Sequence, residues 1–422
     1  MDHLFISRTL GMKLSKMIST EAHSGILKIG IYNEPAGSGI GGSESMVAVL
    51  AEALSREHQV ELLHHIPALS ADRLAESSGT DLSNVRLRYF EPDYNPTERH
   101  RDPRRRYEAS RKWNAALSEP YDLFIAVMHG KPPFCHADKG VLVVLYPTHT
   151  EHYVQIRGKS LIRSALRRPF EYLYQNWEWK KRMEGYQLKT AISDFSRLWT
   201  QRRWNIDCEV AHPPVDNHFR HVEKASIILS VGRFAIEWEG HTKKQLEMLT
   251  AFRQMDEEGL QDWEYFCVGG LRDAPGNRAY FERLCSIGAE GRARVIANVK
   301  RDELKSLYER ASIFWHAAGY GEDENVNPVL MEHFGIATVE AMAAGCVPVV
   351  INKGGQREIV EHGINGFLWN TLEELKEYTS VLISDGQLRA RMSESARLRA
   401  KFFSREEAVA KFLRLLHLPL SR

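Results

Sequence analysis

The sequence predicts an α/β protein of two Rossmann-like, doubly wound domains that face each other across a cleft. The chain has 422 residues, 43% of them hydrophobic, and this length fits two domains of about 150 to 200 residues each. In both halves, short apolar runs alternate with amphipathic stretches, which is the pattern of parallel sheets covered by helices. The halves are separated by HPPVDNHF (residues 212–219), where two prolines interrupt regular structure.

The first half opens with a strand, a helix and a second strand. The first strand is ILKIGIY (residues 26–32), the helix covers residues 43–56, and the second strand is VELLHH (residues 60–65). Further apolar runs predict later strands of the same sheet at residues 122–128, 141–147 and 189–195. We therefore expect an amino-terminal domain over residues 26–215, after a disordered extension over residues 1–25.

The second half repeats this alternation. Apolar runs predict its strands at residues 225–234, 265–270, 293–299, 311–317 and 346–352. We expect a second domain over residues 216–403. Ser404 and Glu407 form a capping box before an apolar stripe, so a final helix is expected over residues 404–422. The carboxyl ends of both sheets should meet at one cleft, where ligands of such sheets bind.

Composition and charge exclude several classes of protein. The 56 lysines and arginines nearly balance the 55 aspartates and glutamates, so whole-molecule charge gives no basis for nucleic-acid binding. The five cysteines are scattered without a CxxC pair, which argues against a zinc knuckle and fits a reducing cytosol. No apolar run approaches the roughly 18 residues of a membrane span, and residues 1–25 lack the apolar core of a signal peptide. We therefore expect a cytoplasmic protein.

A glycine-rich loop follows the first strand. Gly37, Gly39 and Gly42 satisfy the GxGxxG pattern, but four residues precede the first glycine and no acid ends the second strand. A nicotinamide-dependent oxidoreductase is therefore the less favoured alternative. We favour a phosphate-binding role for this loop, in which the backbone amides of Gly41 and Gly42 approach a phosphate at the start of a helix that begins near Ser43. Taken alone, the loop equally fits a simple turn.

Three basic residues lie near the start of the second half. Arg233 follows the first strand in SVGRF, and Lys243 and Lys244 begin a predicted helix in GHTKKQ. An arginine and a lysine at such a junction can neutralise a diphosphate, the arginine through bidentate bonds to its oxygens. Either residue alone would equally fit a solvated surface charge.

Two glutamates eight residues apart lie in EHFGIATVE (residues 332–340). Glu332 is expected in a glycine-containing loop and Glu340 inside a helix, so that both carboxylates line one wall of the cleft. A carboxylate suits paired ribose hydroxyls, a role that fits Glu340. Glu332 is expected to orient a sugar hydroxyl or to stabilise developing positive charge. By spacing alone, such a pair also fits a solvated helix face.

This segment resembles the E-x7-E motif of retaining GT-B glycosyltransferases of family 4, the glycosyl transferases group 1, many of which transfer mannose or glucose. The resemblance covers nearly all of residues 27–422 and is strongest over residues 225–369. It implies transfer of a hexose, with retention of configuration, from a GDP- or UDP-sugar to a hydroxyl of a glycan or lipid-linked acceptor. It also implies that the domain over residues 26–215 binds the acceptor and that the domain over residues 216–403 binds the nucleotide sugar. It implies no cofactor beyond this donor substrate. The segment EHFGI, preceded by the acidic residues 322–324, is similar to a segment of the mannosyltransferases that assemble lipid-linked oligosaccharides.

The resemblance also implies roles for single residues. Arg233 and Lys243 resemble the diphosphate-binding pair, Glu340 resembles the ribose-binding glutamate, and Glu332 matches the sugar-facing glutamate. His129, at the end of the run FIAVM, resembles the active-site histidine near the donor sugar. The other implied donor contacts are Gly41 and Gly42, the backbone of Phe334, Gly335 and Ile336, and the strand end beside the base, with Ile296 and Asn298. The predicted catalytic residues are Glu332, His129, Arg233 and Lys243.

No metal site is predicted. No aspartate has another aspartate two positions away, so the metal-binding DxD motif of GT-A transferases is absent. Arg233, Lys243 and helix dipoles are expected to replace a divalent cation at the diphosphate. No residue is spaced as an enzymatic nucleophile, so we expect a front-face substitution in which the departing phosphate helps to deprotonate the acceptor.

Two regions rich in basic and aromatic residues are candidate contacts with an anionic membrane surface. One runs from Arg99 to Trp113 and the other from Arg157 to Met183. They equally fit a pair of solvated helices. Two locations therefore remain as alternatives: the cytosol, and a peripheral position at the cytoplasmic face of the membrane. The alternative to an enzyme is a non-catalytic protein that binds sugar nucleotides. The presence of both Arg233 and Lys243 argues against this alternative.

Overall fold

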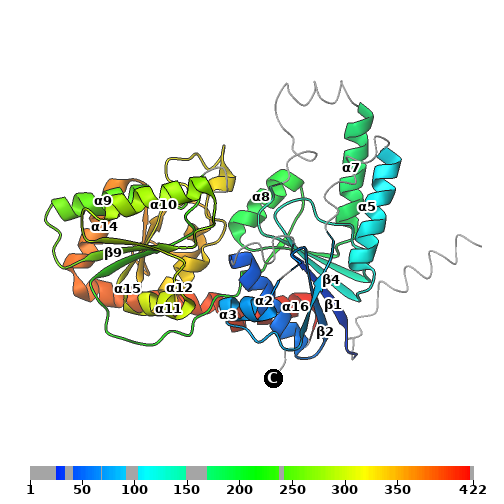
Figure 1. Ribbon diagram of the computed structural model, residues 1–422, viewed down its shortest axis with the longest axis horizontal. Coiled ribbons are helices and arrows are strands. Elements are labelled where there is room, and N and C mark those ends of the chain that lie inside the picture. Colours follow the sequence, from blue (N-terminus) through cyan, green and yellow to red (C-terminus); the bar gives the residue numbers. More distant parts are fainter. Residues whose placement is uncertain are drawn as a thin grey trace, which may run out of the picture.

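The computed structural model describes residues 25–33, 41–67, 69–91, 103–148, 169–236 and 242–418. These residues form two α/β domains, each with a parallel sheet between layers of helices (Figure 1). The prediction of two doubly wound domains is therefore confirmed. The predicted extension, except for Gly25, and the glycines Gly37 and Gly39 lie outside the described residues.

The amino-terminal sheet has seven parallel strands in the order β3-β2-β1-β4-β5-β6-β7. The strands are β1 (Lys28–Asn33), β2 (Gln59–His64), β3 (Val85–Tyr89), β4 (Leu123–Met128), β5 (Lys139–Val144), β6 (Leu188–Ala191) and β7 (Glu209–Val210). Every residue of β4 is buried, because helices cover both faces of the sheet at its centre. The strand order reverses between β1 and β4, and the carboxyl ends of strands at such a switch point are where ligands bind.

Helices cover the two faces of this sheet with different apolar cores. The helices are α2 (Gly42–Ser55), α3 (Ala71–Ser78), α5 (Pro103–Ser118), α7 (Pro169–Glu184) and α8 (Asp194–Trp204). Helix α2 buries Met46, Val47 and Leu50 against one face. On the other face, α5 and α7 pack side by side and project beyond the sheet (Figure 1).

The carboxyl-terminal sheet has six parallel strands in the order β10-β9-β8-β11-β12-β13. The strands are β8 (Ile227–Val231), β9 (Glu264–Gly269), β10 (Ala293–Ala297), β11 (Ile313–His316), β12 (Val347–Ile351) and β13 (Phe367–Trp369). Its helices and short 3-10 turns are α9 (Gln245–Glu257), α10 (Pro275–Gly288), α11 (Arg301–Arg310), η2 (Pro328–Leu330), α12 (Ile336–Ala344), α13 (Gln356–Ile359), α14 (Leu372–Ser384), α15 (Gly386–Ala400) and η3 (Lys401–Phe403). Helices α9, α10 and α14 share one core, whereas α12 and α15 pack on the opposite face.

The chain returns to the first domain at its end. Ser404 caps α16 (Arg405–Leu416), and its hydroxyl accepts the N–H of Glu407 at 3.2 Å, as the capping box predicts. Helix α16 lies against α2 (Figure 1), and Lys139 of β5 donates to the carbonyl of Leu416 at 2.6 Å. The two crossings between domains run together, because Val215 and Ser404 form a parallel β-bridge.

Direct contacts also join the two domains. Arg301 of α11 donates to the carbonyl of Ser77 at 2.8 Å, and the Ser193 hydroxyl donates to the carbonyl of His333 at 2.5 Å. An apolar cluster spans the interface and consists of Tyr146, Phe195, Trp199 and Met331. These contacts hold the loop before α12 against the first domain, next to the ends of its strands.

The two basic and aromatic regions coincide in part with α5 and α7. Trp179 and Arg182 of α7 are only 3% and 6% exposed, and Arg182 pairs with Glu178 at 2.7 Å. The predicted membrane contact is therefore wrong for Trp179 and Arg182, because both side chains pack inside the domain. Trp177 is exposed, whereas residues 99–102 and 157–168 lie outside the described residues. Within the part of the chain that the structure describes, no helix is long and apolar enough to cross a bilayer.

Candidate functional site

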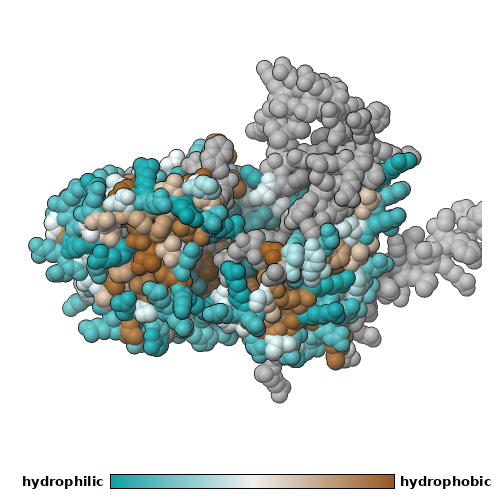
Figure 2. Space-filling model, in the orientation of Figure 1, coloured by the Kyte–Doolittle hydropathy of each residue, from teal (hydrophilic) through white to brown (hydrophobic). Residues whose placement is uncertain are grey.

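The carboxyl ends of the strands of both sheets carry the predicted site residues. His129 directly follows β4 of the first sheet, Arg233 lies two residues after β8 of the second, and His316 ends β11. The molecular surface is hollowed where the two domains meet (Figure 2). Residues from distant parts of the sequence therefore gather at the boundary between the domains, as expected for doubly wound sheets.

Glu332 lies in the loop before α12, at the centre of a polar cluster. Its Oε2 accepts a bond from Lys243 Nζ at 2.6 Å and lies 2.9 Å from His316 Nε2. Gly232 makes room for the lysine, because a Cβ at this position would lie 2.6 Å from Cγ of Lys243. The structure thus joins two predicted catalytic residues, Glu332 and Lys243. It adds His316, which the sequence analysis missed although a histidine in the apolar run ASIFWHA is an unusual polar residue.

His129 and Arg233 approach each other from different domains. Both side chains are exposed, and the imidazole of His129 lies 6.2 Å from that of His333, measured between ring centroids. Although part of His129 remains open to solvent, the protein packed around its imidazole and the charge of Arg233 lower its pKa. A neutral imidazole can donate to or accept from a hydroxyl, and an exposed guanidinium can bind an anion. The fold therefore brings these two predicted catalytic residues near each other from the two domains that face across the cleft.

Glu340 sits on α12, where its Oε2 accepts a bond from the Tyr308 hydroxyl at 3.0 Å. Burial raises the pKa of Glu340 to about 7, although the Tyr308 bond and the charge of Arg301 act in the opposite direction. Tyr308 is itself buried in α11, so it fixes the carboxyl group rigidly. A carboxyl group with a pKa near neutral pH can lose its proton when hydroxyl donors bind to it, because their hydrogen bonds favour the carboxylate form.

Two helices bring their amino termini close together between the domains. A Cβ at Gly42, the first residue of α2, would lie 2.7 Å from Cδ1 of Ile336, the first residue of α12. Such a pair of positive helix ends favours an anion. The N–H of Gly41, however, already donates to the buried carboxylate of Glu44 at 3.1 Å. The predicted phosphate contact of Gly41 therefore requires this bond to break.

The remaining predicted donor contacts lie at the edge of the second domain. Ile296 is half-buried in β10. Asn298 follows β10 with φ +55°, and its side chain accepts the Leu271 N–H at 2.9 Å and donates to the Leu271 carbonyl at 3.3 Å. These bonds tie the ends of β9 and β10 together. The Phe334 ring is buried against the His212 ring at 5.4 Å, so only the Phe334 backbone is placed for a donor contact.

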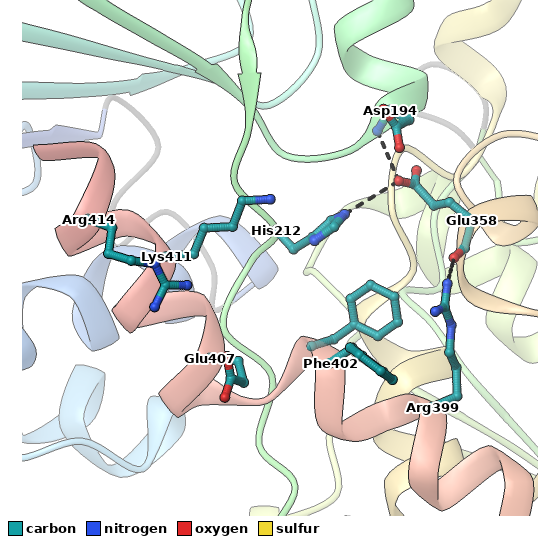
Figure 3. A pocket seen from close by; sticks show the side chains of 9 residues that line it. Asp194, His212, Glu358, Arg399, Phe402, Glu407, Lys411 and Arg414 are labelled. Carbon is teal, nitrogen blue, oxygen red and sulfur yellow. Dashed lines mark hydrogen bonds and ion pairs between the residues drawn. The ribbon is translucent and has the colours of Figure 1, made fainter.

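A separate pocket of about 290 Å³ lies at the crossing between the domains (Figure 3). Glu358 Oε2 accepts the N–H of Asp194 at 2.9 Å and lies 3.5 Å from Nε2 of His212, which ties α13 to α8 and to the linker. The residues that line the pocket are Asp194, His212, Glu358, Arg399, Phe402, Phe403, Glu407, Lys411 and Arg414. None of them is a predicted donor contact, so this pocket is separate from the candidate donor site.

Gly335→Ala is expected to destabilise the protein by about 2 to 5 kcal/mol, the sum of a strained backbone and overpacking. Gly335 has φ +123°, and a Cβ would lie 2.7 Å from Nε2 of Gln356. Gly363→Ala is the matched control, because Gly363 has φ +78° with nothing within 4 Å of the added Cβ. It should lose only about 1 to 2 kcal/mol. Urea unfolding measures both losses, and equal values would contradict the proposed crowding at Gly335.

Comparison with known proteins identifies the second domain. Residues 215–399 match the family described as Glycosyl transferases group 1. The GDP-Man:Man(3)GlcNAc(2)-PP-Dol alpha-1,2-mannosyltransferase of Dictyostelium discoideum is 27% identical to this chain over 237 residues. The alignment covers 52% of this chain and 44% of that protein, so the chain matches less than half of the relative's length.

Solved structures resemble the whole chain. A glycosyltransferase from Rickettsia africae ESF-5 has a TM-score of 0.66 at 16% identity, with 93% of this chain and 98% of that chain covered. Anabaena HepE in complex with UDP-glucose has a TM-score of 0.60 at 17% identity, with 93% and 99% covered. At these identities the similarity shows the fold. Residues 215–399 therefore form a domain of the glycosyl transferases group 1, and the two facing domains of the chain have the GT-B fold.

Proposed function

We propose that this chain is a retaining hexosyltransferase. It moves a hexose of the mannose or glucose type from a nucleotide-diphosphate sugar to a hydroxyl of a glycan or lipid-linked acceptor. The observation that carries this proposal is the pairing of Lys243 with Glu332 at 2.6 Å, at the ends of the strands of a family 4 domain. The Dictyostelium relative is named for GDP-Man, and the Anabaena structure contains UDP-glucose, so both donors are candidates.

Five polar side chains bind different parts of the donor in this proposal. Arg233 and Lys243 bind the diphosphate, which also faces the amino terminus of α12. Glu340 accepts bonds from the ribose hydroxyls. Glu332 binds the sugar, and its contact with Lys243 supports the proposal because the sugar and the diphosphate are adjacent groups of one molecule. His129, with its lowered pKa, serves as a neutral hydrogen-bonding partner for a sugar hydroxyl.

The proposed reaction takes place on one face of the sugar. The bond between the anomeric carbon and the phosphate oxygen breaks as the acceptor oxygen attacks from the same side. The departing diphosphate takes the acceptor proton, so the products are the glycoside and the nucleoside diphosphate. Arg233 and Lys243 stabilise the charge on the leaving group, and Glu332 stabilises the positive charge that develops on the sugar. These two cations supply the charge that a divalent metal ion supplies elsewhere.

Donor turnover by the purified chain tests the proposal. We expect one of GDP-mannose, UDP-glucose and their ADP counterparts to release its nucleoside diphosphate, and the release to rise when oligosaccharide or lipid-linked acceptors are added. EDTA should leave the rate unchanged, because no divalent ion takes part. Binding of a sugar nucleotide without any turnover would favour a non-catalytic binding protein instead. A rate that depends on added Mg²⁺ or Mn²⁺ would refute metal independence.

A further inference from the structure

His316 is a buried polar residue that the proposed chemistry does not yet use. It is the last residue of β11 and only 4% exposed. Its Nε2 lies 2.9 Å from Oε2 of Glu332, the oxygen that also accepts from Lys243. Its other ring nitrogen, Nδ1, is buried and has no hydrogen-bond partner among the described residues. The imidazole therefore makes a single directed contact, and this contact is with the sugar-facing glutamate.

The surroundings determine which nitrogen of His316 carries the proton. A proton on Nε2 is donated to the Glu332 carboxylate, whereas a proton on Nδ1 would be buried without an acceptor. Burial lowers the pKa of His316, against the effect of Glu332, and the charge of Lys243 lowers it further. His316 is thus a neutral donor to Glu332 through Nε2–H.

The two donors to Glu332 differ in their freedom to move. Lys243 carries a point charge on a flexible four-carbon chain, and the proposed function assigns this charge to the donor diphosphate. His316 has only two side-chain torsions, stands at the end of a buried strand and is enclosed on all sides. His316 is therefore the better suited of the two to hold the carboxylate in a fixed position.

We propose that His316 is a positioning residue that keeps Glu332 aimed at the donor sugar while Lys243 binds the diphosphate. The inference rests on the proposed function, because it needs a sugar at Glu332 and a diphosphate at Lys243. It adds a division of labour: the lysine binds the leaving group, and the histidine orients the carboxylate beside the reacting carbon. His316 therefore acts through Glu332 and touches neither substrate.

Two substitutions separate this role from a purely structural one. His316→Leu removes the donor and keeps an apolar side chain in the buried site. His316→Gln keeps an N–H, because the glutamine amide nitrogen can reach about the position of Nε2. We expect His316→Leu to lower kcat about 10- to 100-fold, the effect of losing a hydrogen bond to a charged group. His316→Gln should recover most of this loss.

Binding of the bare nucleoside diphosphate provides the second readout. GDP or UDP, whichever matches the sugar nucleotide turned over, lacks the sugar, so calorimetry should give Kd values within about twofold for wild type and His316→Leu. In a Glu332→Gln background, His316→Leu should lower kcat much less than in wild type, because the two residues act as a unit. Circular dichroism and thermal unfolding confirm that each variant is folded.

Each outcome decides one question. If the wild-type chain turns over no sugar nucleotide, the proposed function fails before His316 is tested. If the wild type is active and His316→Leu keeps its kcat, the positioning role is overturned. The role is also overturned if His316→Leu weakens GDP or UDP binding as much as it lowers kcat, since the histidine would then only maintain the shape of the whole cleft. A selective loss of kcat that His316→Gln reverses supports the proposal.

Discussion

Replacing Lys243 by methionine should lower kcat/KM about 100- to 1000-fold, the usual effect of removing one group that stabilises a developing negative charge. Methionine keeps the unbranched chain that packs over Gly232 but removes the ammonium group. The departing diphosphate then loses one of its two proposed cations, and the Glu332 carboxylate loses the partner that lies at 2.6 Å. Initial rates with varied donor concentration measure the effect.

The neighbouring lysine provides a matched control. Lys244 is as buried as Lys243, but it pairs with Glu322 at 3.2 Å instead of Glu332. Lys244→Met should therefore change kcat/KM by only a few-fold. Equal losses in the two variants would mean that general positive charge, and not the placement of Lys243, supports turnover. Full activity of Lys243→Met would remove this residue from the site.

Glu340→Gln should weaken donor binding about 100-fold, because the neutral amide replaces the carboxylate that we propose accepts two ribose hydroxyls. The same substitution should stabilise the free protein at pH 8. Burial raises the pKa of Glu340 to about 7 from an ordinary value of 4.5, so the folded chain holds this proton more tightly than the unfolded chain does. The stability that comes from this proton is fully present below pH 4.5 and is lost as the pH rises to about 7.

Two pH series check this prediction. The melting temperature of Glu340→Gln should exceed that of the wild type at pH 8 and approach it at pH 4.5. Wild-type donor affinity should fall about tenfold per pH unit below pH 7, because binding requires the carboxylate form. In Glu340→Gln this contribution should disappear. A variant that melts earlier than wild type at pH 8 and still binds the donor tightly would contradict both the pKa assignment and the ribose contact.

Most strands were predictable because their sequences are continuous apolar runs, as in LFIAVM of β4. Strand β3 was not predicted, because its sequence VRLRY alternates with arginines; an edge strand is partly exposed and needs no apolar run. The strand predicted at residues 189–195 is shorter in the structure. That strand ends at Ala191, because Ser193 accepts the Ser196 N–H and starts α8.

The candidate site was predictable where spacing along the chain carries the signal. Glu332 and Glu340 are close in sequence, and Arg233 and Lys243 flank a single strand-to-helix junction. Contacts between segments that are far apart along the chain leave no such pattern in the sequence. His316 is 16 residues from Glu332, and only the folded sheet brings the two within 2.9 Å.

Two of the predicted donor contacts are engaged in local hydrogen bonds in the folded chain. The Asn298 side chain bonds the backbone of Leu271, and the Gly41 amide bonds Glu44. Both interactions depend on side-chain directions that residue types alone do not determine. The sequence therefore predicts which segments reach the cleft better than it predicts which atoms face a ligand.

Calorimetric titration with sugar nucleotides tests the central claim most directly, namely that the cleft binds a nucleotide-diphosphate sugar. GDP-mannose, UDP-glucose and ADP-glucose are each titrated into wild type, Lys243→Met and Glu340→Gln. We predict that one of the three binds wild type with one site per chain, and that both variants bind it at least tenfold more weakly. Absence of binding to wild type by all three donors, or equal affinity in all three proteins, would contradict the claim.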